Sequence, residues 1–122
     1  MSDKVFAWEK ITKTFPGVTA LQDVSISLHA GEVHALVGEN GAGKSTLIHL
    51  AAGVYRPDQG SVLIKGASHY STPVGARDSG VVTVFQESEL FGHLSVAENI
   101  ALLQGIPVNQ AGIVNWSQIH ET

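Results

Sequence analysis

The chain has 122 residues, no cysteine and a net charge of −4 at pH 7, with 43% hydrophobic and 15% charged residues. This length allows one domain with a moderate core, and the composition is that of a globular protein rather than a disordered one. The 7 Lys and Arg residues stand singly in an acidic chain, which excludes general attraction to nucleic acid or anionic lipid. The lack of cysteine excludes disulfides and thiolate metal sites, which suits a reducing cytoplasm.

No segment resembles an export signal or a membrane span. The N-terminal "MSDKVFAWEKITK" places charges where a signal peptide needs a continuous apolar region. The longest apolar stretches, "LIHLAAGV" and "NIALLQGIPV", are much shorter than the roughly 18 to 20 residues that span a bilayer. We therefore expect no direct membrane insertion, and membrane contact only through a partner.

Alternating apolar and polar residues predict three strands. Residues 5–11 alternate and are followed by a turn signal at Pro16-Gly17. In residues 24–28, Val, Ile and Leu alternate with serines, which indicates a strand with one solvated face, ended by Ala30-Gly31. The segment 61–66, "SVLIKG", has the same pattern and follows the turn "YRPDQG".

Two further segments are apolar at nearly every position. Residues 33–38, "VHALVG", and 81–85, "VVTVF", have the composition of strands covered on both faces, as in a parallel sheet. We expect 33–38 to be the central strand. His34, on such a strand, is expected to make a hydrogen bond in the core rather than to do chemistry.

Cap signals mark the predicted helices. Residues 45–52 fit a short helix, with Gly53 in the place of a left-handed C-cap. Ser95 is expected to cap a helix through Leu103, with Glu98 at the capping-box position. Residues 70–79 show no clear period and are predicted to be a loop with a possible helical turn.

Near the C-terminus the signal is weaker. The segment 115–122, "NWSQIHET", begins a further helix. Two alternatives stay open for its apolar side chains: Trp116 and Ile119 face the start of a helical subdomain, or they form an exposed pair.

The stretch "LVGENGAGKSTL" contains the pattern G-x-x-x-x-G-K-[ST], which is typical of phosphate-binding loops. The glycines let successive backbone N–H groups point inward, and the N-terminus of the following helix adds positive potential. The ammonium of Lys44 is expected to reach the β and γ phosphates, while Ser45 ligates Mg²⁺ and Thr46 assists. The alternative is a glycine-rich turn with an exposed lysine; an apolar segment before the loop and a helix after it favour nucleotide binding. The predicted nucleotide-binding residues of the loop are Gly38, Glu39, Asn40, Gly41, Ala42, Gly43, Lys44, Ser45 and Thr46.

Three phrases, "KTFPGVTALQDVSISL", "GEVHALVGENGAGKSTLIHLAAGVYRPDQGSVLIKG" and "VFQESELFGHLSVAENI", closely resemble the ATP-binding subunits of ATP-binding-cassette (ABC) transporters. "FPGVTAL" with "SVAENI" is similar to the branch that imports ribose, galactose and xylose. The resemblance covers nearly all of this chain but only the first part of one cassette. It implies an α/β P-loop NTPase fold, with an antiparallel β-subdomain and the start of a RecA-like parallel sheet.

The resemblance implies one ATP-binding portion over residues 1–122, with the phosphate loop at 38–46, a Q-loop around 86 and a helical subdomain from about 108. ATP and Mg²⁺ are the implied ligands. Phe15 matches the aromatic residue that stacks on adenine, whereas from its residue type alone it would pack under a turn. Gln86 matches the Q-loop glutamine that contacts Mg²⁺ or the attacking water, the alternative being a solvated loop residue.

The other family motifs are absent from these 122 residues. No run of four apolar residues precedes Asp-Glu, "LSVAEN" is not the signature sequence, and His93 and His120 lack the surroundings of a switch histidine. Glu87 and Glu89 are expected to be surface charges. With Lys44 and Gln86 as its only catalytic candidates, the chain is expected to be a fragment of a longer product that does not hydrolyse ATP alone.

Two functions follow from the resemblance. The chain is the ATP-binding portion of an ATPase that powers sugar import, or it is a truncated, non-catalytic module that binds nucleotide or a partner. Cytosolic ABC proteins of translation or DNA repair fit the sugar-branch phrases less well. The implied partners are the membrane subunits, a second cassette and, indirectly, a substrate-binding protein, with the chain in the cytoplasm at the inner face of the membrane.

Overall fold

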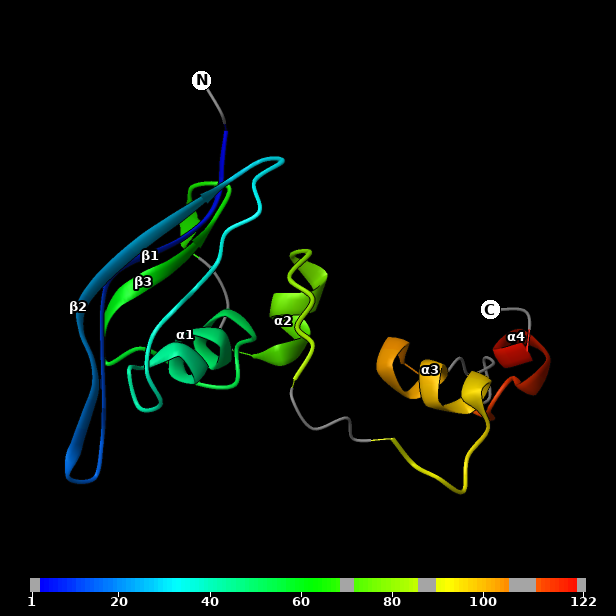
Figure 1. Cartoon of the computed structure of the whole chain (residues 1–122). Coiled ribbons are helices and arrows are strands. Elements are labelled where there is room, and N and C mark those ends of the chain that lie inside the picture. The colour runs from blue at the N-terminus through cyan, green and yellow to red at the C-terminus, as the bar shows by residue number, and fades with distance from the viewer. Residues whose placement is uncertain (1–2, 69–71, 86–89, 106–111, 121–122) are drawn as a thin grey trace. The chain divides into compact units, whose positions relative to one another are not determined.

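The computed structural model describes residues 3–68, 72–85, 90–105 and 112–120. The chain divides into two compact units, Met1–Thr83 and Val84–Thr122. The described part of the first unit contains an antiparallel sheet and the helices α1 and α2, and that of the second contains α3 and α4 (Figure 1).

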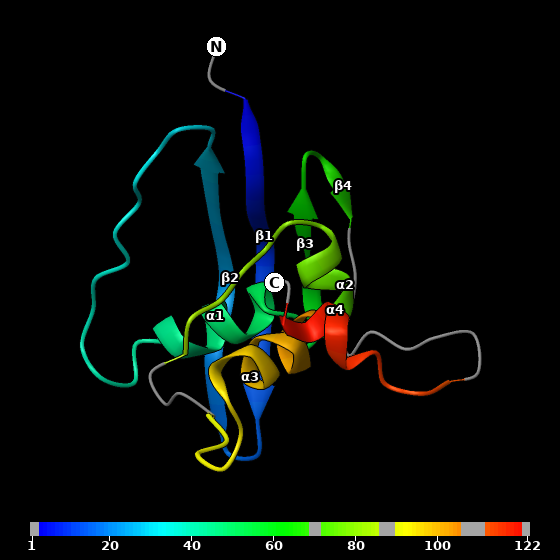
Figure 2. The same ribbon diagram turned by 90° about the vertical axis from the view of Figure 1, so that its right-hand side faces the viewer.

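The sheet has the strand order β2-β1-β3-β4, and all of its pairings are antiparallel. β1 (Lys4–Phe15) pairs with β2 (Val18–His29) across the predicted turn at Pro16-Gly17. The strands predicted at 5–11 and 24–28 are confirmed, but both extend further toward this turn than predicted. β3 (Gln59–Ile64) lies on the other side of β1, so the strand predicted at 61–66 is confirmed with a shift of two residues. Figure 2 shows β2, β1 and β3 side by side, with the short, unpredicted β4 (Ala67–Ser68) at the edge.

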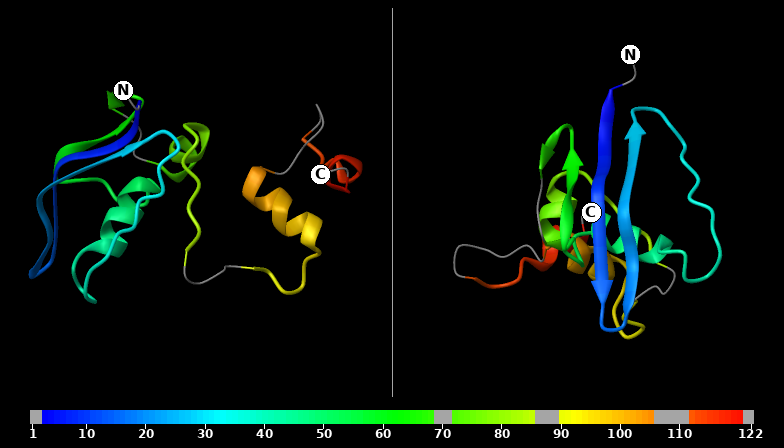
Figure 3. Two further views of the ribbon diagram at one scale, coloured as in Figure 1. Left: turned by 45° about the horizontal axis from the view of Figure 1, so that its top comes forward. Right: turned by 90° about the vertical axis from the view of Figure 1, so that its left-hand side faces the viewer.

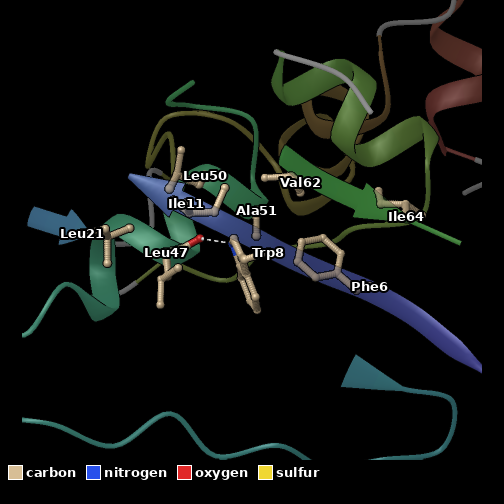
Figure 4. Packing of buried hydrophobic residues seen from close by; sticks show 9 residues of the cluster. All are labelled: Phe6, Trp8, Ile11, Leu21, Leu47, Leu50, Ala51, Val62 and Ile64. Carbon is tan, nitrogen blue, oxygen red and sulfur yellow. Dashed lines mark hydrogen bonds between the residues drawn. The ribbon is translucent and has the colours of Figure 1, made fainter. Parts of the chain in front are cut away.

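The core of the first unit lies between the sheet and α1 (Lys44–Ala51). Figure 3 shows α1 and α2 on the same side of the strands, and Figure 4 shows the packed side chains. Each fully buried Leu or Ile contributes about 1.5–3 kcal/mol relative to an exposed one. The core consists of Phe6, Trp8, Ile11, Leu21, Leu47, Leu50, Ala51, Val62 and Ile64.

Helix α1 spans Lys44–Ala51, one residue earlier than the predicted 45–52, and Gly53 follows its C-cap in the predicted left-handed conformation. Gly53 has φ +73° and donates its N–H to the carbonyl of Leu50, while Val54 donates to His49. This pair of bonds satisfies the last carbonyl groups of the helix in a Schellman arrangement. A Cβ at position 53 would lie 2.4 Å from the carbonyl oxygen of Thr72, so only glycine fits both the conformation and the space.

The two segments predicted as buried strands are not strands, and both predictions are wrong. Residues 33–38 and 81–85 have no regular secondary structure, and Val33 and Val84 are 99% and 93% exposed. A strand buried on both faces requires neighbouring strands that supply hydrogen bonds and layers that cover it. No described strand pairs with either segment, although Val81 packs against the core of the first unit, so the parallel part of the predicted sheet is not formed by them.

The prediction for His34 is wrong for the same reason. Its side chain is 39% exposed, and its Nδ1 lies 2.6 Å from a carboxylate oxygen of Glu32. The hydrogen bond from His34, followed by bonds from the backbone N–H and the ring of His29, lowers the pKa of Glu32 to about 2. His34 therefore belongs to a polar contact at the surface rather than to the core.

Helix α2 (Pro73–Asp78) lies in the segment 70–79, which the sequence predicts to be a loop containing a possible helical turn. The helical turn is therefore present and is longer than one turn. The Oγ1 of Thr72 accepts a hydrogen bond from the N–H of Gly75 at 3.1 Å, and Pro73 occupies the first helical position. Both features are typical helix starts. The beginning of the predicted loop, at 70 and 71, lies outside the described residues.

In the second unit, α3 (Val96–Gln104) confirms the predicted capped helix. The Oγ of Ser95 accepts from the N–H of Glu98 at 3.3 Å, and a carboxylate oxygen of Glu98 accepts from the N–H of Ser95 at 2.7 Å. This reciprocal pair is the capping box that the spacing predicted.

Helix α4 (Trp116–His120) confirms the helix predicted near the C-terminus. Ile119 is only 3% exposed and Trp116 is 55% exposed, so the two side chains do not form an exposed pair. Both border an apolar cavity of about 170 Å³, together with Leu94, Ala101 and Leu102 of the same unit. The predicted start of a helical subdomain near 108 lies outside the described residues.

None of the described helices, in either unit, has the length and apolar character to cross a bilayer.

Candidate nucleotide-binding site

The predicted phosphate loop is an exposed turn that leads into α1. Residues 38–42 are exposed, and the N–H of Ala42 donates to the carbonyl of Glu39 at 3.1 Å. The N–H of Leu47 donates to the carbonyl of Gly43 at 3.0 Å and closes the first turn of the helix. The loop therefore places its backbone at the surface, directly at a helix N-terminus.

Gly43 is the residue on which this geometry depends. It is buried at the N-cap of α1 with φ +91°, a conformation that L side chains rarely adopt. An added Cβ would lie 2.6 Å from Cδ2 of Leu21 and 2.7 Å from the carbonyl oxygen of Ala20. The loop thus packs directly against β2, and only a glycine permits this approach.

The N-terminus of α1 carries the positive potential of its unpaired N–H groups. No side chain caps the helix, and its first turn contains no acidic residue. The first N–H groups of an α-helix have no intrahelical partner and favour a bound anion. The exposed Ser45 and the half-buried Thr46 lie in this first turn, so their hydroxyl groups are placed beside the amide groups.

Lys44 folds back over the loop. Its Nζ donates to the carbonyl oxygen of Gly38 at 2.5 Å and to that of Glu39 at 2.7 Å. The ammonium group therefore lies across the loop rather than extending into solvent, and the side chain is half-buried. The structure brings the loop glycines, Lys44 and the hydroxyls of Ser45 and Thr46 into one short segment.

Phe15 ends β1 and is half-buried. Its ring meets that of Tyr55 edge to face, with centroids 5.2 Å apart and planes at 68°. The Nζ of Lys13 lies 5.5 Å from the centroid of the Phe15 ring. These contacts do not separate adenine stacking from packing, and the stacking role of Phe15 stays a prediction.

Asp58 holds the end of the strand that carries Phe15. Its carboxylate accepts from Nζ of Lys13 at 2.9 Å and from the backbone N–H of Thr14 at 2.7 Å. The bond from Lys13 and then that from Thr14 lower the pKa of Asp58. The carboxylate thereby stays ionised and fixes the backbone next to the aromatic ring.

Sequence reasoning missed two aromatic neighbours of this site. The ring of Tyr55 stacks on that of His49, with centroids 5.1 Å apart and planes at 27°, and Nδ1 of His49 lies 2.6 Å from the carbonyl oxygen of Ser45. Ser45 and His49 are four residues apart in a predicted helix, so the sequence alone indicates that they lie next to each other. No comparable signal points to Tyr55.

The Q-loop candidate Gln86 lies outside the described residues, so its role stays a prediction. Glu87 and Glu89, predicted to be surface charges, also lie outside them. His93 contacts the ring of Phe91 edge to face, with centroids 6.0 Å apart, and His120 ends α4. In the described ranges no group of three or more acidic or histidine side chains is placed to hold a metal ion.

Comparison with known proteins places the chain in one family. The family profile described as ABC transporter matches residues 21–122. The chain is 48% identical over 115 residues to "Ribose import ATP-binding protein RbsA 1" of Rhizobium meliloti (strain 1021), covering 93% of this chain and 23% of that protein. It is 57% identical over 97 residues to "Ribose import ATP-binding protein RbsA 2" of Streptomyces avermitilis, covering 79% and 19%.

Solved structures agree with this result. A nucleotide-free ATP-binding cassette from an ABC transporter matches with a TM-score of 0.74 and 30% identity, covering 98% of this chain and 46% of that one. The ADP conformation of an ABC transporter cassette matches with a TM-score of 0.73 and 29% identity, covering 98% and 46%. The chain spans about a fifth of the length of the two ribose import proteins. With a profile match over most of its length and the fold of a partial cassette, this chain belongs to the ABC transporter family.

Proposed function

We propose that residues 38–46 bind the triphosphate of ATP, and that the chain is the ATP-binding portion of an ABC transporter ATPase that powers sugar import. The observation that carries the proposal is the loop itself. Gly43 brings the backbone against β2, and Lys44 holds an ammonium group across the same loop at the start of α1. An exposed turn that combines free helix amides with one fixed cation matches the chemistry of phosphate oxygens.

Lys44 is the main charged contact in this proposal. Its two hydrogen bonds go to neutral carbonyl oxygens of Gly38 and Glu39. Phosphate oxygens carry full negative charge, and charge-assisted hydrogen bonds are about twice as strong as neutral ones. A β or γ phosphate seated at the loop therefore competes well for the ammonium group without a large movement of the side chain.

The residues near the helix start fit a magnesium ion that arrives with the nucleotide. Mg²⁺ is bound by few protein ligands together with substrate phosphates and water, and an exposed hydroxyl such as that of Ser45 suits this role. Bound Mg²⁺ would neutralise charge on the phosphate oxygens. Gln86 is proposed as a second contact, and Phe15 as the stacking surface for adenine.

The transported substrate and the partners are inferred from the relatives. Proteins named for ribose import are 47–57% identical to this chain in the alignments that cover 79–93% of it. We therefore assign the chain to sugar import, working in the cytoplasm at the inner face of the membrane. Its partners would be membrane subunits and a second cassette, with a substrate-binding protein acting indirectly.

Calorimetric titration of the 122-residue chain with Mg-ATP tests the proposal, using Lys44→Ala and the matched control Lys4→Ala. Lys4 is an exposed lysine on β1 whose ion pair with Glu9 is remote in sequence from the loop. The Lys44 variant should bind more than tenfold more weakly, a loss above about 1.4 kcal/mol, and the Lys4 variant should bind like the parent. Equal affinity of Lys44→Ala and the parent would disprove the loop assignment.

A further inference from the structure

Three aromatic rings from separate parts of the first unit form a continuous series. Phe15, at the end of β1, meets Tyr55 edge to face at 5.2 Å, and Tyr55 lies stacked on His49 of α1 at 5.1 Å. Tyr55 follows the glycine that ends α1 and is 36% exposed. The series connects the last residue of the strand with the helix that begins at the phosphate loop.

The series ends in a hydrogen bond to the loop side of α1. Nδ1 of His49 lies 2.6 Å from the carbonyl oxygen of Ser45. A carbonyl oxygen only accepts hydrogen bonds, so Nδ1 of His49 carries a hydrogen and is the donor of this bond. This bond restrains the imidazole ring, and the ring of Tyr55 stacks on it with the two planes at 27°.

Phe15 also has a second, independent contact, with the ammonium of Lys13. The ammonium of Lys13 lies 5.5 Å from the ring centroid and is paired with Asp58, which also accepts from the N–H of Thr14. A phenylalanine beside a hairpin turn would otherwise exchange rotamers in solvent. Here its ring contacts both a cation and a second aromatic ring.

We infer that Tyr55 is a positioning residue that holds Phe15 at a set place relative to the phosphate loop, with His49 as the link to that loop. The inference rests on the proposed function, in which Phe15 stacks on the adenine of ATP. A nucleotide must meet the loop and the stacking ring at the same time. Fixing Phe15 before binding reduces the ordering cost of binding, which corresponds to about twofold to tenfold in affinity.

The test compares two probes, Mg-ATP and magnesium tripolyphosphate, by calorimetry on the 122-residue chain. Tripolyphosphate offers the phosphate groups without a base. Tyr55→Leu keeps an apolar side chain but no ring, and Tyr55→Phe keeps the ring without the hydroxyl. We expect Tyr55→Leu to weaken Mg-ATP binding about twofold to tenfold and to leave tripolyphosphate binding unchanged. Tyr55→Phe should bind both probes like the parent.

Two further variants, Phe15→Ala and the double variant, distinguish the positioning role of Tyr55 from the proposed stacking role of Phe15. Phe15→Ala should weaken the binding of Mg-ATP and leave the binding of tripolyphosphate unchanged. Adding Tyr55→Leu to Phe15→Ala should cause no further loss of Mg-ATP affinity, because both substitutions act through the ring of Phe15. If Phe15→Ala leaves Mg-ATP binding unchanged, the proposed stacking role fails. If Phe15→Ala weakens it and Tyr55→Leu does not, the positioning role alone is overturned.

The remaining outcomes are also decisive. A loss of both probes in Tyr55→Leu would indicate general damage to the loop and overturn the inference, as would additive losses in the double variant. His49→Leu provides a second measurement that does not depend on substituting Tyr55. It removes the stacked ring and the bond to Ser45, and it should reduce Mg-ATP affinity selectively if the series acts as inferred.

Discussion

The indole Nε1 of Trp8 donates a hydrogen bond to the carbonyl oxygen of Leu47 at 3.2 Å, and the two residues lie 39 positions apart in the chain (Figure 4). Trp8 belongs to β1, an inner strand of the sheet, and Leu47 to the helix that starts after residues 38–43. The contact joins the two layers of the first unit by a buried polar bond inside an apolar core. The position of the loop thus depends on a strand far from it in sequence.

Replacing Trp8 should measure this link. Trp8→Phe keeps an aromatic ring but loses the donor, and we expect it to lower the free energy of unfolding by about 1–2 kcal/mol. Trp8→Ala should cost about 3–5 kcal/mol because it also leaves a cavity. Urea unfolding followed by circular dichroism measures both changes. Trp116→Phe, at a position that is 55% exposed, is the control and should change stability by less than about 0.5 kcal/mol.

Gly43 and Gly41 form a matched pair for the loop. Both have φ near +90°, but a Cβ would strike Leu21 and the Ala20 carbonyl at position 43 and would meet nothing within 4 Å at position 41. Gly41→Ala should cost about 1–2 kcal/mol from strain alone. Gly43→Ala should cost about 1–3 kcal/mol more and weaken Mg-ATP binding. Equal stabilities of the two variants in urea unfolding would show that the contact with β2 is unimportant.

Stability should depend on pH through Asp58. The folded state lowers the pKa of this carboxylate, first through the bond from Lys13 and then through that from Thr14. A lowered pKa stabilises the fold above the ordinary value of about 3.9, and the stabilisation is lost as pH falls through the folded value. Asp58→Asn should therefore be less stable than the parent at pH 7.

The difference between Asp58→Asn and the parent should shrink progressively as the pH is lowered below about 4. Thermal unfolding at pH 7 and at acid pH measures it. Asp78→Asn is the control, because its carboxylate is 68% exposed and lies 3.8 Å from Arg77 in a surface pair of little energetic weight. A difference that stayed constant over this range would show that the charge of Asp58 is not the source of its effect.

The chain alone should bind Mg-ATP without turning it over. Hydrolysis requires a positioned base and charge stabilisation around the γ-phosphate, and these 122 residues contain no apolar run followed by Asp-Glu. Phosphate release from the purified chain measures this, with Lys44→Ala as the control for contaminating ATPase. Steady release by the parent that is lost in Lys44→Ala would contradict the expectation and make Glu87 the first candidate for the base.

Features that depend on a few neighbouring residues could be predicted from the sequence. The glycine-lysine pattern of the loop, the glycine that ends α1 and the capping box of Ser95 and Glu98 all occur where their spacing predicted them. The turn at Pro16-Gly17 belongs to the same class, because its signal is local. In each case the backbone groups that need partners find them within a few residues.

The apolar run at 33–38 shows where such reasoning fails. Its composition predicts a buried strand, but composition only says that burial would be favourable, whereas a strand exists only beside a partner that completes its hydrogen bonds. The contacts of Trp8 with Leu47 and of Phe15 with Tyr55 have no sequence signal either, because they depend on where the sheet places α1. The sequence alone therefore determined which glycines, lysine and hydroxyl residues stand in the loop at 38–46 and that a helix follows them. Only the tertiary structure decided which rings and strands lie against that loop, because those contacts join residues that are distant along the chain.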